Sequence, residues 1–174
     1  MKAALEQLHR WIFLMQQVHE AKHYIARTEQ LAHPELMQSF DEIWGVLLHF
    51  RGARNSYAKC FVSSGSGKTT LNAPTVFFTK PELVESHQRI MELRHKYVAH
   101  SDDNELEKTS FESTDTPSEL VIRLQYALSF PFDRMYELRG LIQHLDGYVA
   151  EGLEKHVAGI ARQVGKPVRI LEGG

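Results

Sequence analysis

Cysteine is almost absent from this sequence, in which Cys60 stands alone. A disulfide within the chain and a zinc site built on several cysteines are therefore both excluded, and a reducing compartment is the simplest expectation. The chain also lacks the apolar segment and cleavage site of a signal peptide. It has no apolar run near the roughly 18 residues that a membrane span requires. We therefore expect a soluble, cytoplasmic protein without membrane contact.

No excess of either charge marks the chain, whose formal net charge is -2. Binding to nucleic acid through bulk electrostatics is thereby disfavoured, and any such contact needs a local basic patch. Hydrophobic residues make up 43% and charged residues 24% of the sequence, as in ordinary globular proteins. A length of 174 residues suits one domain with its own core, spanning residues 1–174.

Apolar residues recur every three or four positions over most of the chain, which indicates amphipathic helices. Pro34 is suited to opening the second helix, and Thr79-Lys80-Pro81-Glu82 reads as a capping box at the start of the third. The spacing predicts helices over about 3–31, 34–58, 80–100 and 130–163.

Two segments depart from the helical period. From Leu120 to Leu128 apolar residues alternate strictly with their neighbours, which favours a half-buried strand, and Lys108–Ser113 is its shorter partner. We expect a β-hairpin over about 107–129 and a long loop over about 59–79. The predicted fold is mainly α: an up-and-down four-helix bundle with the hairpin inserted before the last, long helix.

Two short motifs suggest chemistry that their surroundings do not support. His19-Glu20-Ala21-Lys22-His23 matches the HExxH zinc motif, but Lys22 would place a cation beside the metal and no third ligand is signalled. Gly65-Ser66-Gly67-Lys68-Thr69 resembles the end of a phosphate-binding loop, but Val62 stands where the first glycine belongs and no helical pattern follows. We expect a solvated helix face and an ordinary loop, with a zinc hydrolase as the least favoured function.

The third motif lies in Leu93–Asp102, where Arg94 is followed by the polar His95 and then by His100. It resembles the motif of the HEPN family (higher eukaryotes and prokaryotes nucleotide-binding domain), an arginine and a histidine four to six residues apart near a helix end. The apolar residues 97–99 and the hairpin and long helix that follow are similar to the abortive-infection-like subgroup. The resemblance covers most of the chain and implies a HEPN-type bundle, although only the short motif is specific.

The HEPN resemblance implies a metal-independent, cofactor-free endoribonuclease that builds a composite site in a homodimer. His100 would act as general acid or base, Arg94 would stabilise charge on the phosphorane, and His95 would assist, with Lys96 and Ser101 as RNA contacts. Such nucleases often serve toxin–antitoxin or phage-defence systems, which implies an antitoxin or a nucleotidyltransferase-like partner. The alternative is a non-catalytic nucleotide-binding, RNA-binding or dimerisation module of the same type.

The position of the motif on its helix adds an independent observation. Val84, His87, Met91 and Arg94 fall on one stripe, so two polar side chains interrupt a face that should be buried. Arg94 then pairs with a carboxylate on a neighbouring helix, lies at a solvated edge of the stripe, or points into a polar cleft. On an ideal helix Arg94 and His100 lie about 120° apart around the axis and roughly 9 Å apart along it, so one helix cannot easily direct both side chains at one phosphate. Two copies of the helix that meet on a two-fold axis can do so, because each chain supplies its own Arg94 and His100.

Overall fold

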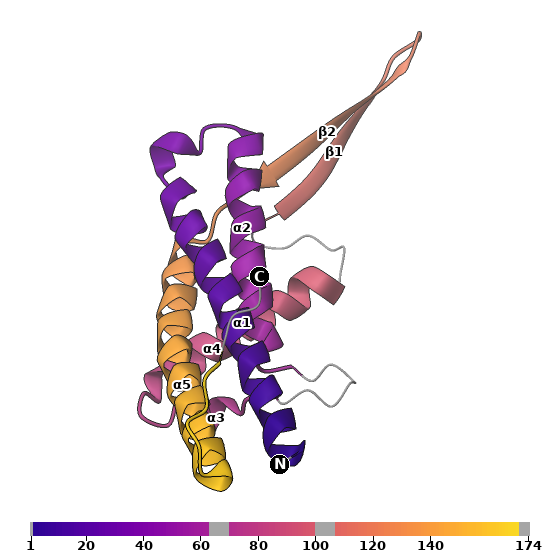
Figure 1. The fold of residues 1–174 in the computed structure, drawn as a ribbon. Coiled ribbons are helices and arrows are strands. Elements are labelled where there is room, and N and C mark those ends of the chain that lie inside the picture. The colour runs from indigo at the N-terminus through magenta and orange to yellow at the C-terminus, as the bar shows by residue number, and fades with distance from the viewer. Residues whose placement is uncertain (1, 63–69, 100–106, 171–174) are drawn as a thin grey trace.

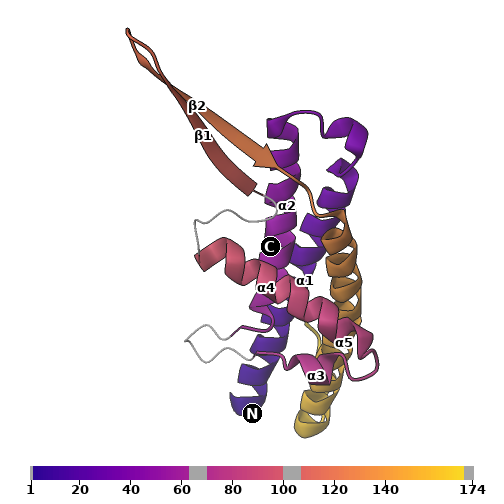
Figure 2. The same cartoon turned by 180° about the vertical axis from the view of Figure 1, so that it is seen from behind.

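Three long helices stand side by side and form the body of the protein, as a computed structural model that describes residues 2–62, 70–99 and 107–170 shows (Figure 1). A further helix crosses this body obliquely, and a two-stranded hairpin projects away from it (Figure 2). The predictions of a mainly helical fold and of a hairpin before the last helix are confirmed. Within the described ranges, no helix is long and apolar enough to cross a membrane. In chain order the elements are α1 (Lys2–Leu31), a 3-10 turn (Pro34–Leu36), α2 (Phe40–Lys59), α3 (Ala73–Val76), α4 (Glu82–Ala99), β1 (Glu107–Asp115), β2 (Leu120–Leu128) and α5 (Phe132–Val164).

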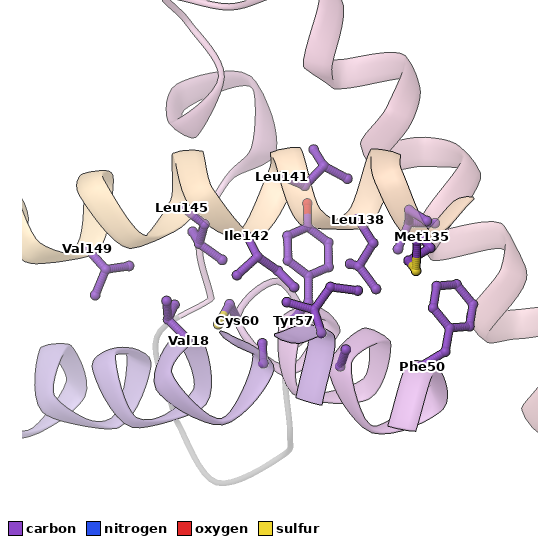
Figure 3. Close-up of a cluster of buried hydrophobic side chains, with 14 of the residues drawn as sticks. Val18, Phe50, Tyr57, Cys60, Met135, Leu138, Leu141, Ile142, Leu145 and Val149 are labelled. Carbon is purple, nitrogen blue, oxygen red and sulfur yellow. The ribbon is translucent and has the colours of Figure 1, made fainter. Parts of the chain in front are cut away.

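The core lies where α1, α2 and α5 meet (Figure 3). Val18 of α1, Tyr57 of α2 and Leu138 and Leu145 of α5 are fully buried there. Burying a large apolar side chain contributes about 1.5–3 kcal/mol, so a core of this kind is sufficient to hold the helices together. The apolar period of the sequence thus identified the buried face of α5, but on α1 it placed Leu5 and Ile12 on the buried face, whereas both are exposed and Leu14 is buried.

The second helix begins later than the sequence predicts. Pro34 opens only the 3-10 turn, and α2 begins at Phe40 behind the N-cap Ser39. The Ser39 hydroxyl accepts from the Glu42 amide at 3.3 Å, while the Glu42 carboxylate accepts from the Ser39 amide at 2.9 Å. The first backbone amides of a helix have no partner within the helix, and this reciprocal capping box satisfies two of them. Proline in the first turn provides no such hydrogen bonds, so Ser39 sets the start of α2.

The segment predicted as a loop contains an additional short helix. In α3 the Asn72 side chain caps the helix by accepting from the Thr75 amide at 3.2 Å. Val76 and Phe77 at its end are buried and bring this segment onto the core. The motif of residues 65–69, which resembles the end of a phosphate-binding loop, lies outside the described residues. The capping box predicted at Thr79 does not start α4, which begins at Glu82.

A close approach of α1 and α5 at Gly152 gives a prediction about stability. A Cβ added there would overlap the ring of Trp11, whereas one added at Gly147 of the same helix meets nothing within 4 Å. We expect Gly152→Ala to lower the free energy of unfolding by about 1–3 kcal/mol, because overpacking outweighs the better helix propensity of alanine. Urea unfolding measures this change. Gly147→Ala is the matched control and should raise stability by roughly 0.5–1 kcal/mol, and a rise in both variants would contradict the close approach.

Candidate functional site

Helix α4 carries the first part of the HEPN-like motif, Leu93–Ala99, and packs on the body by one face. His87 and Ile90 are buried, while Val84, Met91 and Arg94 are half-buried. The stripe expected from the sequence therefore does face the protein, with its more exposed positions at the two ends. Arg94 lies toward the C-terminal end of the helix, where a positive charge also interacts favourably with the helix dipole.

Arg94 differs from the other arginine of α4 in its surroundings. Arg89 is held by Glu137 of α5, with 2.7 Å between Nη2 and the carboxylate, and by Glu85 at 3.8 Å. Among the described residues, no carboxylate lies within ion-pair distance of Arg94. Of the three arrangements considered from the sequence, pairing with a core carboxylate finds no partner in the described part of the chain, and the half-buried Arg94 is compatible with a solvated edge or a polar cleft.

A second arginine, Arg54, lies beside the same end of α4 and was missed by the sequence analysis. It belongs to α2, is 2% exposed, and donates from Nη1 to the Leu93 carbonyl at 3.2 Å. Its Nη2 also donates to the Asn55 side chain at 3.4 Å. The sequence feature that could have identified Arg54 as buried is its position between Phe50 and Tyr57 on the apolar stripe of α2. Arg54 thus binds the backbone of α4 at Leu93, one residue before Arg94.

The remaining residues of the predicted site cannot be placed relative to these arginines. His100 and Ser101 lie outside the described residues, directly after the end of α4 at Ala99. His95 and Lys96 belong to α4, but their side chains lie outside what the structure describes. The roles of these four residues therefore stay predictions.

His87, the other polar residue on the stripe, forms a buried pair with Tyr57. The Tyr57 hydroxyl and Nδ1 of His87 are 2.7 Å apart, and the rings of Phe61 and Phe77 pack against the imidazole. Burial lowers the pKa of His87 to about 4 and raises the pKa of Tyr57. His87 is therefore uncharged at neutral pH, where Nδ1 accepts from the hydroxyl if the ring proton sits on Nε2. The pair fastens α4 to α2 and does not suit proton transfer.

Comparison with known proteins identifies no relative for this arrangement. No protein-family model, curated protein or solved structure matches the chain. The HEPN resemblance stays a prediction from the motif that begins at Arg94.

The HExxH segment lies on the outer face of α1. His19 and His23 are exposed and border an open groove of about 750 Å³, while Glu20 is half-buried and lies 4.0 Å from Lys59. Lys22 points elsewhere and pairs with Asp146 of α5 at 2.7 Å. Within the described ranges, no three histidine, cysteine, aspartate or glutamate side chains gather where they could hold a metal ion.

Proposed function

We propose that the protein is a metal-independent endoribonuclease of HEPN type that acts as a homodimer in the cytoplasm. The observation that supports this most is the half-buried Arg94 beside the buried Arg54, with no described carboxylate within ion-pair distance of Arg94. An arginine with no carboxylate within ion-pair distance among the described residues is suited to a phosphate, because guanidinium binds phosphate through paired hydrogen bonds.

The proposed reaction uses the RNA as its own nucleophile. The 2′-hydroxyl attacks the adjacent phosphorus and the bond to the 5′-oxygen breaks, which leaves a 2′,3′-cyclic phosphate and a 5′-hydroxyl. Arg94 stabilises the charge that develops on the phosphorane, and His100 transfers the proton as general acid or base. His95 assists at the phosphate, and Lys96 and Ser101 contact the flanking RNA. No step requires a metal ion or a cofactor.

A homodimer is proposed because of helical geometry. Arg94 and the position of His100 lie about 120° apart around an ideal helix, so a single α4 does not direct both groups at one phosphate easily. Two copies of α4 near a two-fold axis supply two arginines and two histidines to one cleft. We also propose, by analogy with HEPN systems, a toxin–antitoxin or phage-defence setting with an antitoxin or nucleotidyltransferase-like partner.

The test is incubation of the purified protein with an end-labelled RNA pool in EDTA. We expect cleavage that leaves 2′,3′-cyclic phosphate and 5′-hydroxyl ends, detected by treating the products with phosphatase and kinase before analysis. Absence of cleavage by folded protein would contradict the proposal and favour the non-catalytic binding or dimerisation module. Cleavage that EDTA abolishes would instead require a metal ion and would contradict the proposed chemistry.

A further inference from the structure

The projecting hairpin exposes an apolar face that, among the described residues, α2 contacts only at Tyr126. Phe111 of β1 pairs with Leu124 of β2 in an antiparallel register, so their side chains share a face. Ile122 and Tyr126 lie on that face as well. Their exposed fractions range from 58% to 69%, and Leu120 at the tip is 61% exposed. A contiguous apolar patch on a soluble protein usually marks an interaction site.

The outer edge of β2 is also open to a further strand. Thr116 donates from its amide to the Glu119 carbonyl at 2.9 Å, so these two residues form a hydrogen-bonded pair of the hairpin. Hydrogen-bonded and non-hydrogen-bonded pairs alternate along antiparallel strands, so this pair determines the type of every other pair. By that alternation, Ile122, Leu124 and Tyr126 direct their backbone groups away from β1. The nine residues of β2 include neither proline nor glycine, and only Arg123 is charged. Natural edge strands are usually protected from pairing by charged side chains or proline, and Arg123 is the one such residue in β2.

We propose that β2 pairs with β2 of a second copy of this chain, antiparallel and centred on Leu124. Both copies then contribute their apolar faces to the same side of one four-stranded sheet. In this register Arg123 lies opposite Gln125 of the second copy, so no like charges meet. Pairing through β1 centred on Phe111 would instead place Glu107 opposite Asp115 of the second copy, twice over, which is unfavourable.

The same register connects the hairpin to an exposed stripe on α2. The rings of Tyr126 and Phe40 make an edge contact with centroids 6.1 Å apart, and Phe40 stacks on Trp44 at the same distance. Leu48, one turn further along α2, is 51% exposed. Ile122 of the second copy would lie opposite Tyr126, beside this stripe. The tip of each hairpin is thereby brought next to an apolar surface at the base of the other.

The apolar surface beside the paired strands sets an upper limit on the area that the dimer can bury there. Full burial of a large apolar side chain corresponds to roughly 100 Å², and these side chains are about half exposed, so the hairpin face and the α2 stripe together offer at most about 400–500 Å² on each copy. Typical stable interfaces bury about 800 Å² per partner, and the edge backbone adds to the total. RNA fits this surface poorly, because the hairpin and its turn carry four acidic residues (Glu107, Glu112, Asp115 and Glu119) against two basic ones (Lys108 and Arg123).

A charge-swap experiment tests the register directly, because Leu124 lies opposite itself. We expect wild type to be a dimer in sedimentation equilibrium, and Leu124→Lys and Leu124→Glu each to raise the dissociation constant at least about 100-fold, since like charges then meet. Mixing the two variants should restore a dimer. Thr114→Lys and Thr114→Glu, on the other face of the hairpin, are matched controls that should leave dimers. Helical circular dichroism and melting of each variant verify that the helical body is folded.

Several results of this experiment would overturn the proposed pairing through β2. A monomeric wild type, or charge variants that stay dimeric, would mean that β2 does not join two copies. Monomeric variants that fail to recombine would contradict the pairing centred on Leu124. Loss of binding to RNA or to another protein without a change in dimer mass would assign the hairpin to a different partner. Dimer mass is measured without RNA, so a dimer without cleavage would overturn only the proposed function. Leu124 variants that stay dimeric and cleave RNA would place the two-fold axis at α4 and would overturn only the pairing through β2.

Discussion

Replacing Arg94 or His100 with alanine should lower the rate of RNA cleavage at least about 100-fold in each case. Loss of a single donor to a developing oxyanion costs about 10²–10³ in rate, and loss of a general acid or base costs about 10²–10⁴. Arg94 is half-buried at the end of α4 where Arg54 also lies, so its charge acts in a partly dehydrated setting. Single-turnover cleavage of a labelled RNA measures both variants.

Three controls distinguish chemistry from folding in these variants. Arg94→Lys keeps the charge but loses the paired hydrogen bonds, so we expect it to retain only part of the activity. Arg27→Ala removes an exposed arginine of α1 whose side chain donates to Gln30 at 3.1 Å, and this variant should cleave at the wild-type rate. All variants should match wild type in dimer mass and helical content. Unchanged cleavage by Arg94→Ala or by His100→Ala would mean that the active site lies elsewhere.

Acidification should destabilise the protein through His87. The unfolded imidazole has a pKa of about 6.5, while burial against Phe61 and Phe77 lowers the folded pKa to about 4. Between these two values the unfolded chain binds more protons, so the contribution is complete above pH 6.5 and is lost as the pH falls toward 4. Urea unfolding at about pH 7.5 and pH 4.5 should show a loss of about 2–3 kcal/mol from this group.

His87→Asn is the control for this pH dependence. The asparagine carbonyl can accept from the Tyr57 hydroxyl as Nδ1 does, but the amide does not titrate. We expect the variant to be less stable at neutral pH, because it loses ring contacts, and to lose less stability than wild type on acidification. An equal loss in both proteins would mean that His87 contributes nothing to the pH dependence.

Periodicity predicted the long helices because their apolar faces are buried within the chain. The ends of α1 and α5 agree closely with the sequence, and Gly165 after α5 adopts the left-handed conformation with φ 66° that suits a helix C-cap. The start of α2 was wrong because the reciprocal bonds of Ser39 and Glu42 decide it, and Pro34 lies in a separate turn. Local side-chain bonds of this kind are hard to rank from sequence alone.

The alternation in β2 correctly predicted a strand, but its burial was wrong. Leu124 and Tyr126 are about 60% exposed, because no other part of the described chain covers this face of the hairpin. An alternation with a period of two indicates that one face of a strand is apolar, but it does not indicate whether the same chain or another molecule covers that face. In the proposed pairing, Ile122 of each copy lies beside the α2 stripe of the other, so the second copy covers part of this face.

The candidate site could be predicted only in part. The stripe on α4 identified His87 and Arg94 as unusual, but the sequence did not separate their roles. His87 is neutral and bonded to Tyr57, whereas Arg94 has no carboxylate within ion-pair distance among the described residues. Arg54 was missed because its proximity to Leu93 depends on how α2 and α4 pack, which periodicity along one helix does not specify.

The most direct test of the nuclease is a comparison of two substrates of identical sequence, one of RNA and one with 2′-O-methyl groups throughout. The protein is incubated with each in EDTA, and cleavage rates are measured under the same conditions. Because the proposed nucleophile is the 2′-hydroxyl, we predict cleavage of the RNA and none of the methylated strand. Equal cleavage of both strands, or of neither by folded protein, would contradict the proposed function.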